Sequence, residues 1–280
     1  MIKQRIAFLG AGNMAEAIIS GFVNSDKLNA DQITVTNRSN QNRLNELKEK
    51  YGINAVSKDQ LNYKEIDVFI LAMKPKDIDE VMEDLKERIT ADQLLISVLA
   101  GISTSYMEEN LNEGQQVIRV MPNTSSMIQE SATAVSPGRH VAMDQVLMTK
   151  ELMKCIGEAY IIDEDKMDIY TGIAGSGPAY FYNLMEHIEE VAHQAGLDRE
   201  LAREIGAQTL YGAAKMILDQ NETPAQLREN ITSPNGTTAA GLKALNEYGG
   251  GQAIMEAVKS AAARSKELSK QPEKKLALQK

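Results

Sequence analysis

The sequence predicts an α/β fold in which an N-terminal Rossmann-type, doubly wound parallel sheet is followed by an all-helical C-terminal domain. From the N-terminus to about residue 160, short apolar runs alternate with segments whose apolar residues recur at helical spacing. Beyond Met167 we find no convincing strand pattern, and long helical patterns dominate. We therefore expect two domains, residues 1–165 and 166–280, with a frayed polar tail at the C-terminal end.

Short apolar runs are the expected strands of the first domain. One of them, DVFILAM, is apolar without alternation, as expected for a parallel strand that helices cover on both faces. In chain order they read RIAFLG, QITVT, DVFILAM, LLISVLA and QVIRVMP. Helices are expected between them, one running from Met14 to Phe22, one capped by Asn40, and one running from Ile78 to Ile89.

The second domain is expected to consist of helices joined by glycine-containing breaks. One helical pattern ends at Gly196, a residue type that often follows a helix C-cap, and the next covers Arg199–Leu218. Farther along, Ser233–Gly236 breaks the chain, and Thr237 begins another helix.

Composition limits the classes of function. The 280 residues are 43% hydrophobic, which is enough to fill the cores of two domains. A net charge of −9 and a pI near 5.0 argue against nucleic acid or an anionic membrane as the main partner. A single cysteine, Cys155, excludes an internal disulfide and a cysteine-based zinc site, and we expect no metal. The apolar runs are too short for a membrane span or a signal peptide, so we expect a cytoplasmic protein.

A glycine-rich segment predicts dinucleotide binding. Gly10, Gly12 and Ala15 in FLGAGNMAEAI follow the first expected strand and open a helix. In that context the first glycine permits a tight turn, and the second lets a pyrophosphate approach the backbone at the helix N-terminus. The alanine allows helix and strand to pack closely. A purely structural glycine turn is the alternative.

The end of the second expected strand bears on the choice of cofactor. Asn37, Arg38 and Ser39 lie where an acidic residue would bind the ribose 2′-hydroxyl of NAD. An arginine suits a 2′-phosphate instead, so NADPH is favoured. A solvated arginine in a turn is the alternative.

The stretch ITSPNGTTAAGL, residues 231–242, predicts an anion site. Free N–H groups and the helix dipole attract a carboxylate, and Gly236 lets a ligand come close. Thr238 adds a hydroxyl that both donates and accepts. The stretch has no conventional nucleophile, base or metal ligand, so it would bind and orient a small anion. An ordinary capped helix is the alternative.

Over nearly its whole length the chain closely resembles the pyrroline-5-carboxylate reductase family. The matching segments, in order, are LAMKP, SVLAGI, RVMPNT, GSGPAYFYNLMEHIEEVAHQAGL, GAQTLYGAAKMIL and LRENITSPNGTTAAGLKAL. The resemblance implies an oxidoreductase that reduces 1-pyrroline-5-carboxylate to L-proline, the last step of proline biosynthesis. The hydride would come from NADPH, with NADH as the alternative cofactor.

The resemblance also implies roles for individual residues. Thr238 would be the catalytic residue, hydrogen bonded to the ring nitrogen of the substrate. Substrate binding would involve Asn235, Gly236, Thr237 and Thr238. Cofactor binding would involve Leu9, Gly10, Ala11, Gly12, Asn13, Met14, Asn37, Arg38, Ser39, Ala72, Lys74, Pro75, Ala100 and Asn230.

One departure from the family concerns the cofactor. Asp59 stands where the family often has an asparagine, and its carboxylate would repel a 2′-phosphate. The preference for NADPH inferred from Arg38 is therefore weakened, unless the neighbouring Lys58 compensates.

Two other interpretations compete with this function. A β-hydroxyacid dehydrogenase shares both kinds of domain, but it needs a lysine as proton acceptor where this chain has Phe181. The other is a non-enzymatic, dinucleotide-binding regulatory protein that kept the fold, and the intact GAGNMA and SPNGTT segments together argue against it.

The helical domain also predicts self-association. Several of its helix faces are apolar, and a small bundle would struggle to cover them alone; they include Leu201, Ile205, Leu210, Ala214 and Ile217. We therefore expect an obligate homodimer. The family resemblance suggests a ring of dimers as a further level of assembly.

Overall fold

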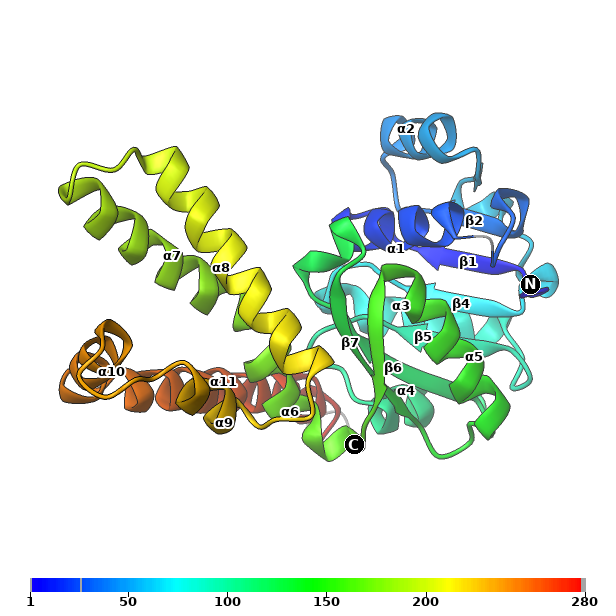
Figure 1. The fold of residues 1–280 in the computed structure, drawn as a ribbon. Coiled ribbons are helices and arrows are strands. Elements are labelled where there is room, and N and C mark those ends of the chain that lie inside the picture. The colour runs from blue at the N-terminus through cyan, green and yellow to red at the C-terminus, as the bar shows by residue number, and fades with distance from the viewer. Residues whose placement is uncertain (1, 26, 278–280) are drawn as a thin grey trace. The chain divides into compact units, whose positions relative to one another are not determined.

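The computed structural model describes residues 2–25 and 27–277, and it contains two compact units (Figure 1). The first unit comprises the chain up to Gly175 together with the C-terminal segment from Ala261. The second unit comprises Ser176–Ser260. This division follows packing alone, so the functional boundary expected after residue 165 stays a prediction.

The first unit is built on an eight-stranded sheet with the strand order β3-β2-β1-β4-β5-β6-β7-β8. The strands are β1 (Ile6–Leu9), β2 (Ile33–Thr36), β3 (Asn54–Ala55), β4 (Val68–Leu71), β5 (Leu94–Ser97), β6 (Gln116–Met121), β7 (Ser131–Pro137) and β8 (Gly157–Ile161). The apolar runs predicted as strands are β1, β2, β4, β5 and β6, and neighbours among them pair in parallel. The predicted fold class is confirmed.

Three strands were not predicted, and two of them, β7 and β8, run in the opposite direction to the other strands. Strand β7 is antiparallel to β6, and β8 is parallel to β7. The connection Pro122–Glu130 is too short for the crossover that a parallel strand requires, so the chain reverses. Strand β7 carries small polar residues, among them the fully buried Thr133 and Ser136, and therefore lacks an apolar run. The sheet is mostly rather than wholly parallel.

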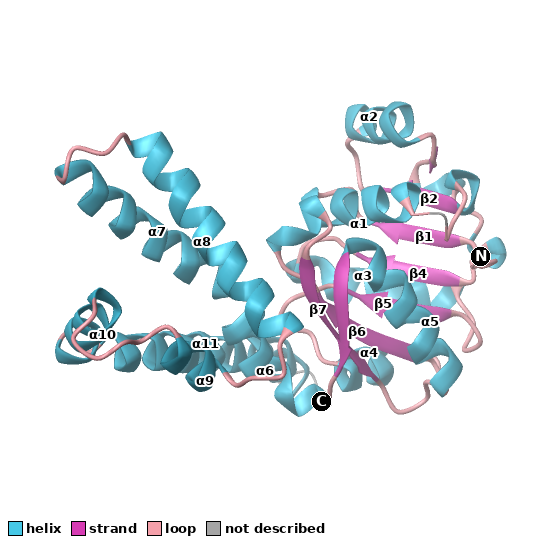
Figure 2. Ribbon diagram, in the orientation of Figure 1, coloured by secondary structure: helices cyan, strands magenta, loops and turns pink. Residues whose placement is uncertain are grey.

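Helices cover both faces of this sheet (Figure 2). One face packs against α1 (Asn13–Asn24), α2 (Gln41–Tyr51) and α5 (Met143–Met153). The other face packs against α3 (Ile78–Arg88) and α4 (Thr104–Asn110). The predicted cap of α2 is confirmed, because the side chain of Asn40 accepts a hydrogen bond from the Arg43 N–H at 3.0 Å.

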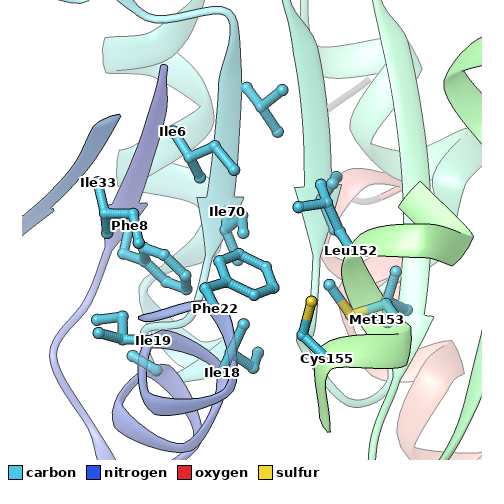
Figure 3. Packing of buried hydrophobic residues seen from close by; sticks show 14 of the residues in the cluster. Ile6, Phe8, Ile18, Ile19, Phe22, Ile33, Ile70, Leu152, Met153 and Cys155 are labelled. Atoms are coloured by element: carbon cyan, nitrogen blue, oxygen red, sulfur yellow. The ribbon is translucent and has the colours of Figure 1, made fainter. Parts of the chain in front are cut away.

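Large apolar side chains hold α1 on the sheet (Figure 3). Phe22 of α1 and Phe8 of β1 are fully buried, with ring centroids 5.9 Å apart. Ile18 and Ile19 pack into the same cluster. Each such side chain contributes about 1.5–3 kcal/mol through burial, so α1 is held firmly against the sheet.

The second unit, every residue of which the structure describes, contains helices and loops but no strand. Its helices are α7 (Gly177–Gln194), α8 (Arg199–Asp219), α9 (Pro224–Asn230), α10 (Thr237–Glu247) and the first part of α11 (Gly250–Ala277). The short α6 (Met167–Tyr170) belongs to the first unit. Gly196 has a φ of +89°, as predicted for the residue that ends α7. No helix in the described part of the chain is both long and apolar enough to span a bilayer.

Candidate cofactor and substrate sites

The predicted pyrophosphate loop lies where the strand order reverses between β1 and β4. In open α/β sheets, ligands bind at the carboxyl ends of strands beside such a reversal. Gly10 follows β1, and its N–H donates to the carbonyl of Thr36 at 2.8 Å. Ala72 follows β4, and its N–H donates to the carbonyl of Leu9 at 2.9 Å. Leu9, Gly10 and Ala72 therefore meet at one edge of the sheet.

The two glycines of this loop are required for different reasons. Gly10 has a φ of +120°, and a Cβ there would lie 2.5 Å from the backbone of Ala72. The fold itself therefore requires glycine at position 10. A Cβ on Gly12 would meet no atom within 4 Å. The open space at Gly12 fits the approach of a pyrophosphate.

The first turn of α1 offers backbone donors to that space. Gly12 is the N-cap, and no side chain caps the helix, so the N–H groups that follow are free for a ligand. Asn13 is exposed and Met14 half-buried in this turn, whereas Ala15 is fully buried against the sheet. The side-chain pattern matches the role of each position in the dinucleotide motif.

One acid, Glu16, lies in the first turn of α1. Its carboxylate accepts hydrogen bonds from Lys50 at 2.8 Å, from Tyr51 at 2.9 Å, and from Arg43. Burial acts to raise the pKa of Glu16, but these hydrogen bonds lower it to about 2. The carboxylate is therefore ionised at neutral pH and balanced by two cations.

The turn after β2 is held by its own side chains. The Asn37 amide donates to the carbonyl of Asn40 at 2.8 Å, and its oxygen accepts from the Asn40 N–H at 2.9 Å. Arg38 and Ser39 are exposed in this turn. The Arg38 guanidinium lies 3.6 Å from a Glu80 carboxylate oxygen and 4.0 Å from one of Asp77. A 2′-phosphate would have to compete with both acids for Arg38.

Lys58, the cation expected to offset Asp59, is also paired. Its ammonium group lies 3.2 Å from the carboxylate of Asp84 on α3. Asp59 itself is exposed in the helical turn Lys58–Gln60, which follows β3. Because Arg38 and Lys58 are both paired with carboxylates, this region attracts a phosphate less strongly than the sequence suggested.

The remaining cofactor candidates of the first unit follow β4 and β5. Lys74 and Pro75 are exposed, and the Lys74 carbonyl accepts from the Asp77 N–H at 3.1 Å. Ala100 is exposed in the turn after β5. Because these strands are parallel, their carboxyl ends lie on the same edge as Gly10.

The predicted substrate residues gather at the N-terminus of α10 in the second unit. Gly236 is its N-cap, and no side chain caps the helix. A Cβ on Gly236 would lie 2.4 Å from the Ser233 hydroxyl, and Asn235 has a φ of +60°. Thr237 is exposed and Thr238 half-buried. The first turn thus presents free N–H groups and two hydroxyls, which suits a small carboxylate.

Asn230, the last residue of α9, has its amide engaged elsewhere in this structure. It donates to the Glu222 carboxylate at 2.8 Å. Its expected contact with the nicotinamide stays a prediction, as do the roles of the other site residues.

Comparison with known proteins decides the family. Residues 164–268 match the family model for pyrroline-5-carboxylate reductase dimerisation, and residues 5–101 match that for NADP oxidoreductase, coenzyme F420-dependent. The chain is 56% identical over 272 residues to pyrroline-5-carboxylate reductase 1 of Bacillus subtilis (strain 168), covering 97% of this chain and 92% of the relative. This chain belongs to the pyrroline-5-carboxylate reductase family.

Solved structures of pyrroline-5-carboxylate reductases share the fold over nearly the whole chain. The Coxiella burnetii enzyme is 35% identical with a TM-score of 0.88, covering 96% of this chain and 99% of that one. The Plasmodium falciparum enzyme, solved with NADP bound, is 28% identical with a TM-score of 0.85 and the same coverage. Both domains of the reductase family are therefore present.

Sequence reasoning missed Arg43, which contacts the predicted pyrophosphate loop of this reductase. Its Nε donates to the carbonyl of Ala11 at 3.0 Å. A signal was available, because Glu16 places an acid in the first turn of the helix that is predicted to bind a phosphate, and such an acid needs a cationic partner. The sequence did not indicate which cation that partner was.

Proposed function

We propose that this chain reduces 1-pyrroline-5-carboxylate to L-proline with a hydride from NADPH or NADH, the last step of proline biosynthesis. The main support for the proposal is the uncapped N-terminus of α10, found in a chain that belongs to this family. It offers free N–H groups and the Thr238 hydroxyl, with no acid, base or thiol in the segment Ser233–Thr238. Such a group of atoms can bind a carboxylate, but it supplies no general acid or base.

The residues of α10 perform the positioning. Thr237 and Thr238 hold the substrate carboxylate with backbone N–H groups, aided by the helix dipole. The Thr238 hydroxyl hydrogen bonds to the ring nitrogen and fixes the orientation of the C=N bond. A protonated imine is already electrophilic, so no strong general acid is needed and catalysis rests mainly on orientation. Asn235 and Gly236 allow the turn to approach the substrate.

The first unit binds the dinucleotide, whose nicotinamide supplies the hydride. Leu9, Gly10, Ala11, Gly12, Asn13 and Met14 bind the pyrophosphate. Asn37, Arg38 and Ser39 bind the adenosine ribose, and Ala72, Lys74, Pro75 and Ala100 bind the rest of the cofactor. Asn230, the remaining cofactor residue that we propose, belongs to the second unit. Residues 1–165 form the cofactor domain in this proposal, and residues 166–280 form the substrate and dimerisation domain.

The assembly is a homodimer formed by the helical domain. The matched dimerisation family and the exposed apolar side chains of α7 and α8 support it. A ring of dimers is the further assembly that we propose on the family resemblance. The cytoplasmic location expected from the sequence stays a prediction.

A spectrophotometric assay tests the function. The full chain is mixed with 1-pyrroline-5-carboxylate and with NADPH or NADH, and oxidation of the cofactor is followed. We expect saturable, imine-dependent oxidation with at least one cofactor, and formation of proline. A folded protein that turns over the imine with neither cofactor would refute the proposal. Oxidation of a β-hydroxyacid with NADP would support the rival dehydrogenase instead.

A further inference from the structure

Arg43 joins three parts of the cofactor domain. It lies in the first turn of α2, and its side chain is only 18% exposed. Its Nε donates to the carbonyl of Ala11 at 3.0 Å, one Nη contacts the carboxylate of Glu16, and the other lies 2.8 Å from Glu46. Each of the three guanidinium nitrogens thus has a protein partner. One partner lies in the glycine-rich loop, one on α1 and one on α2 itself.

The contact with Ala11 fixes the direction of the next N–H group. The Ala11 carbonyl and the Gly12 N–H belong to one planar, trans peptide and point in opposite directions. Holding the carbonyl on Arg43 therefore aims the Gly12 N–H away from it. Gly12 has no side chain to restrict its backbone, and the position of its missing Cβ is open. Without Arg43, this peptide would have more freedom to rotate.

Arg43 also balances the acid of the pyrophosphate-binding helix. Glu16 is the acidic residue in the first turn of α1, where a pyrophosphate would meet its negative charge. Arg43, Lys50 and Tyr51 surround that carboxylate and hold its pKa low despite its burial. A partly buried carboxylate without these partners would repel an anion at the same helix end.

Building on the proposed function, we propose that Arg43 is a positioning residue for the cofactor, acting through the carbonyl of Ala11 and the carboxylate of Glu16. It orients the pyrophosphate loop and neutralises its acid, and it makes no contact with the 2′-phosphate. The pyrophosphate is common to NADPH and NADH. Loss of Arg43 therefore weakens both cofactors by the same factor, whereas a ligand of the 2′-phosphate affects NADPH alone.

The test compares the full-length parent chain with Arg43→Lys and Arg43→Ala. Dissociation constants for NADH and NADPH are measured by titrating the nicotinamide fluorescence, and kcat is measured at saturating cofactor. We expect both constants to rise about ten-fold and equally in Arg43→Ala, with kcat unchanged. Arg43→Lys keeps the charge but loses the planar fork, so we expect a smaller and equally shared rise. Arg5→Ala is the matched control, because Arg5 makes an ion pair with Glu65 on the surface of the same unit.

Two results would overturn the proposal. A rise confined to NADPH would make Arg43 a ligand of the 2′-phosphate, and unchanged constants for both cofactors would make it a structural residue only. Circular dichroism checks folding, and if Arg43→Ala does not fold, Arg43→Lys decides the question. Failure of the proposed function would be seen separately, in the parent chain. The parent chain would then bind the cofactor but would not reduce the imine.

Discussion

The two units of the molecule differ in how they bury apolar surface. In the first unit, Phe8, Phe22 and Phe69 are fully buried within clusters of their own chain. In the second unit only Gly177 and Ala202 are buried, while Val191 is 67% and Ile205 52% exposed. A large exposed apolar surface on helices marks a protein interface. The first unit therefore has a complete core in one chain, whereas the second leaves apolar side chains exposed that the proposed homodimer would cover.

The largest expected effect comes from a charge on the uncovered surface. We predict that Ile205→Asp leaves the chain monomeric and without measurable activity. In a two-fold symmetric dimer the substitution occurs twice, and each buried, unpaired carboxylate costs several kcal/mol. Sedimentation velocity at micromolar concentration and the imine assay measure the two effects. A fully active monomer of 30.8 kDa, from the parent or the variant, would contradict this view of the second unit.

The contrasting substitution lies in the complete core of the first unit. We predict that Phe22→Ala lowers the free energy of unfolding of the first unit by about 3–5 kcal/mol, because it leaves a cavity between α1 and β1. Thermal melts at several protein concentrations measure this loss. The shift in Tm relative to the parent chain is expected to be the same at each concentration. A shift that depends strongly on concentration would mean that this core also depends on the partner copy.

The helix N-termini of the two units allow a second comparison. In the first unit, we predict that Gly12→Ala folds normally but raises the dissociation constants of NADPH and NADH about a hundred-fold, because its methyl group enters the space for the pyrophosphate. Gly10→Ala is the contrasting variant, and it should reduce thermal stability, because a Cβ there clashes with the Ala72 backbone. Cofactor titration and thermal melts separate the two effects. Unchanged cofactor binding in Gly12→Ala would place the pyrophosphate elsewhere.

Sequence patterns predicted the parts of the fold that depend on local runs. Strands β1 (IAFL) and β4 (VFIL) are continuous apolar segments, so their burial on both faces was visible in the sequence. Strand β7 was missed because its buried residues include Thr133 and Ser136, whose hydroxyls resemble those of a loop. Burial of a hydroxyl depends on neighbours that only the folded sheet supplies.

The candidate site divides in the same way. Gly10, Gly12 and Gly236 were predicted because their chemistry depends on adjacent residues in the chain. The Arg43–Glu16 pair spans 27 positions, and Arg38 meets Asp77 and Glu80 on a different helix. Opposite charges are common in any sequence, so these pairs follow only from how α1, α2 and α3 are placed around the sheet.

In the second unit, the N-terminus of α10 should affect chemistry rather than cofactor binding. We predict that Thr238→Ala lowers kcat/KM for the imine by a factor that corresponds to about 1–3 kcal/mol, with the cofactor dissociation constant unchanged. The lost hydroxyl would no longer orient the ring nitrogen. Thr238→Ser keeps a hydroxyl and should restore most of the activity. An unchanged kcat/KM in Thr238→Ala would remove this residue from the mechanism.

The smallest expected effect concerns the choice between NADPH and NADH in the first unit. Arg38 is 78% exposed and already faces Asp77 and Glu80, so its attraction for a 2′-phosphate is partly offset. We predict that Arg38→Ala raises the KM for NADPH about five-fold more than the KM for NADH. Asp59→Asn should act in the opposite direction, because it removes a negative charge from the region expected to hold the phosphate. Steady-state assays at one fixed ionic strength give both ratios, since exposed charges are screened by salt. An equal effect of Arg38→Ala on the two cofactors would show that Arg38 belongs only to its ion pairs with α3.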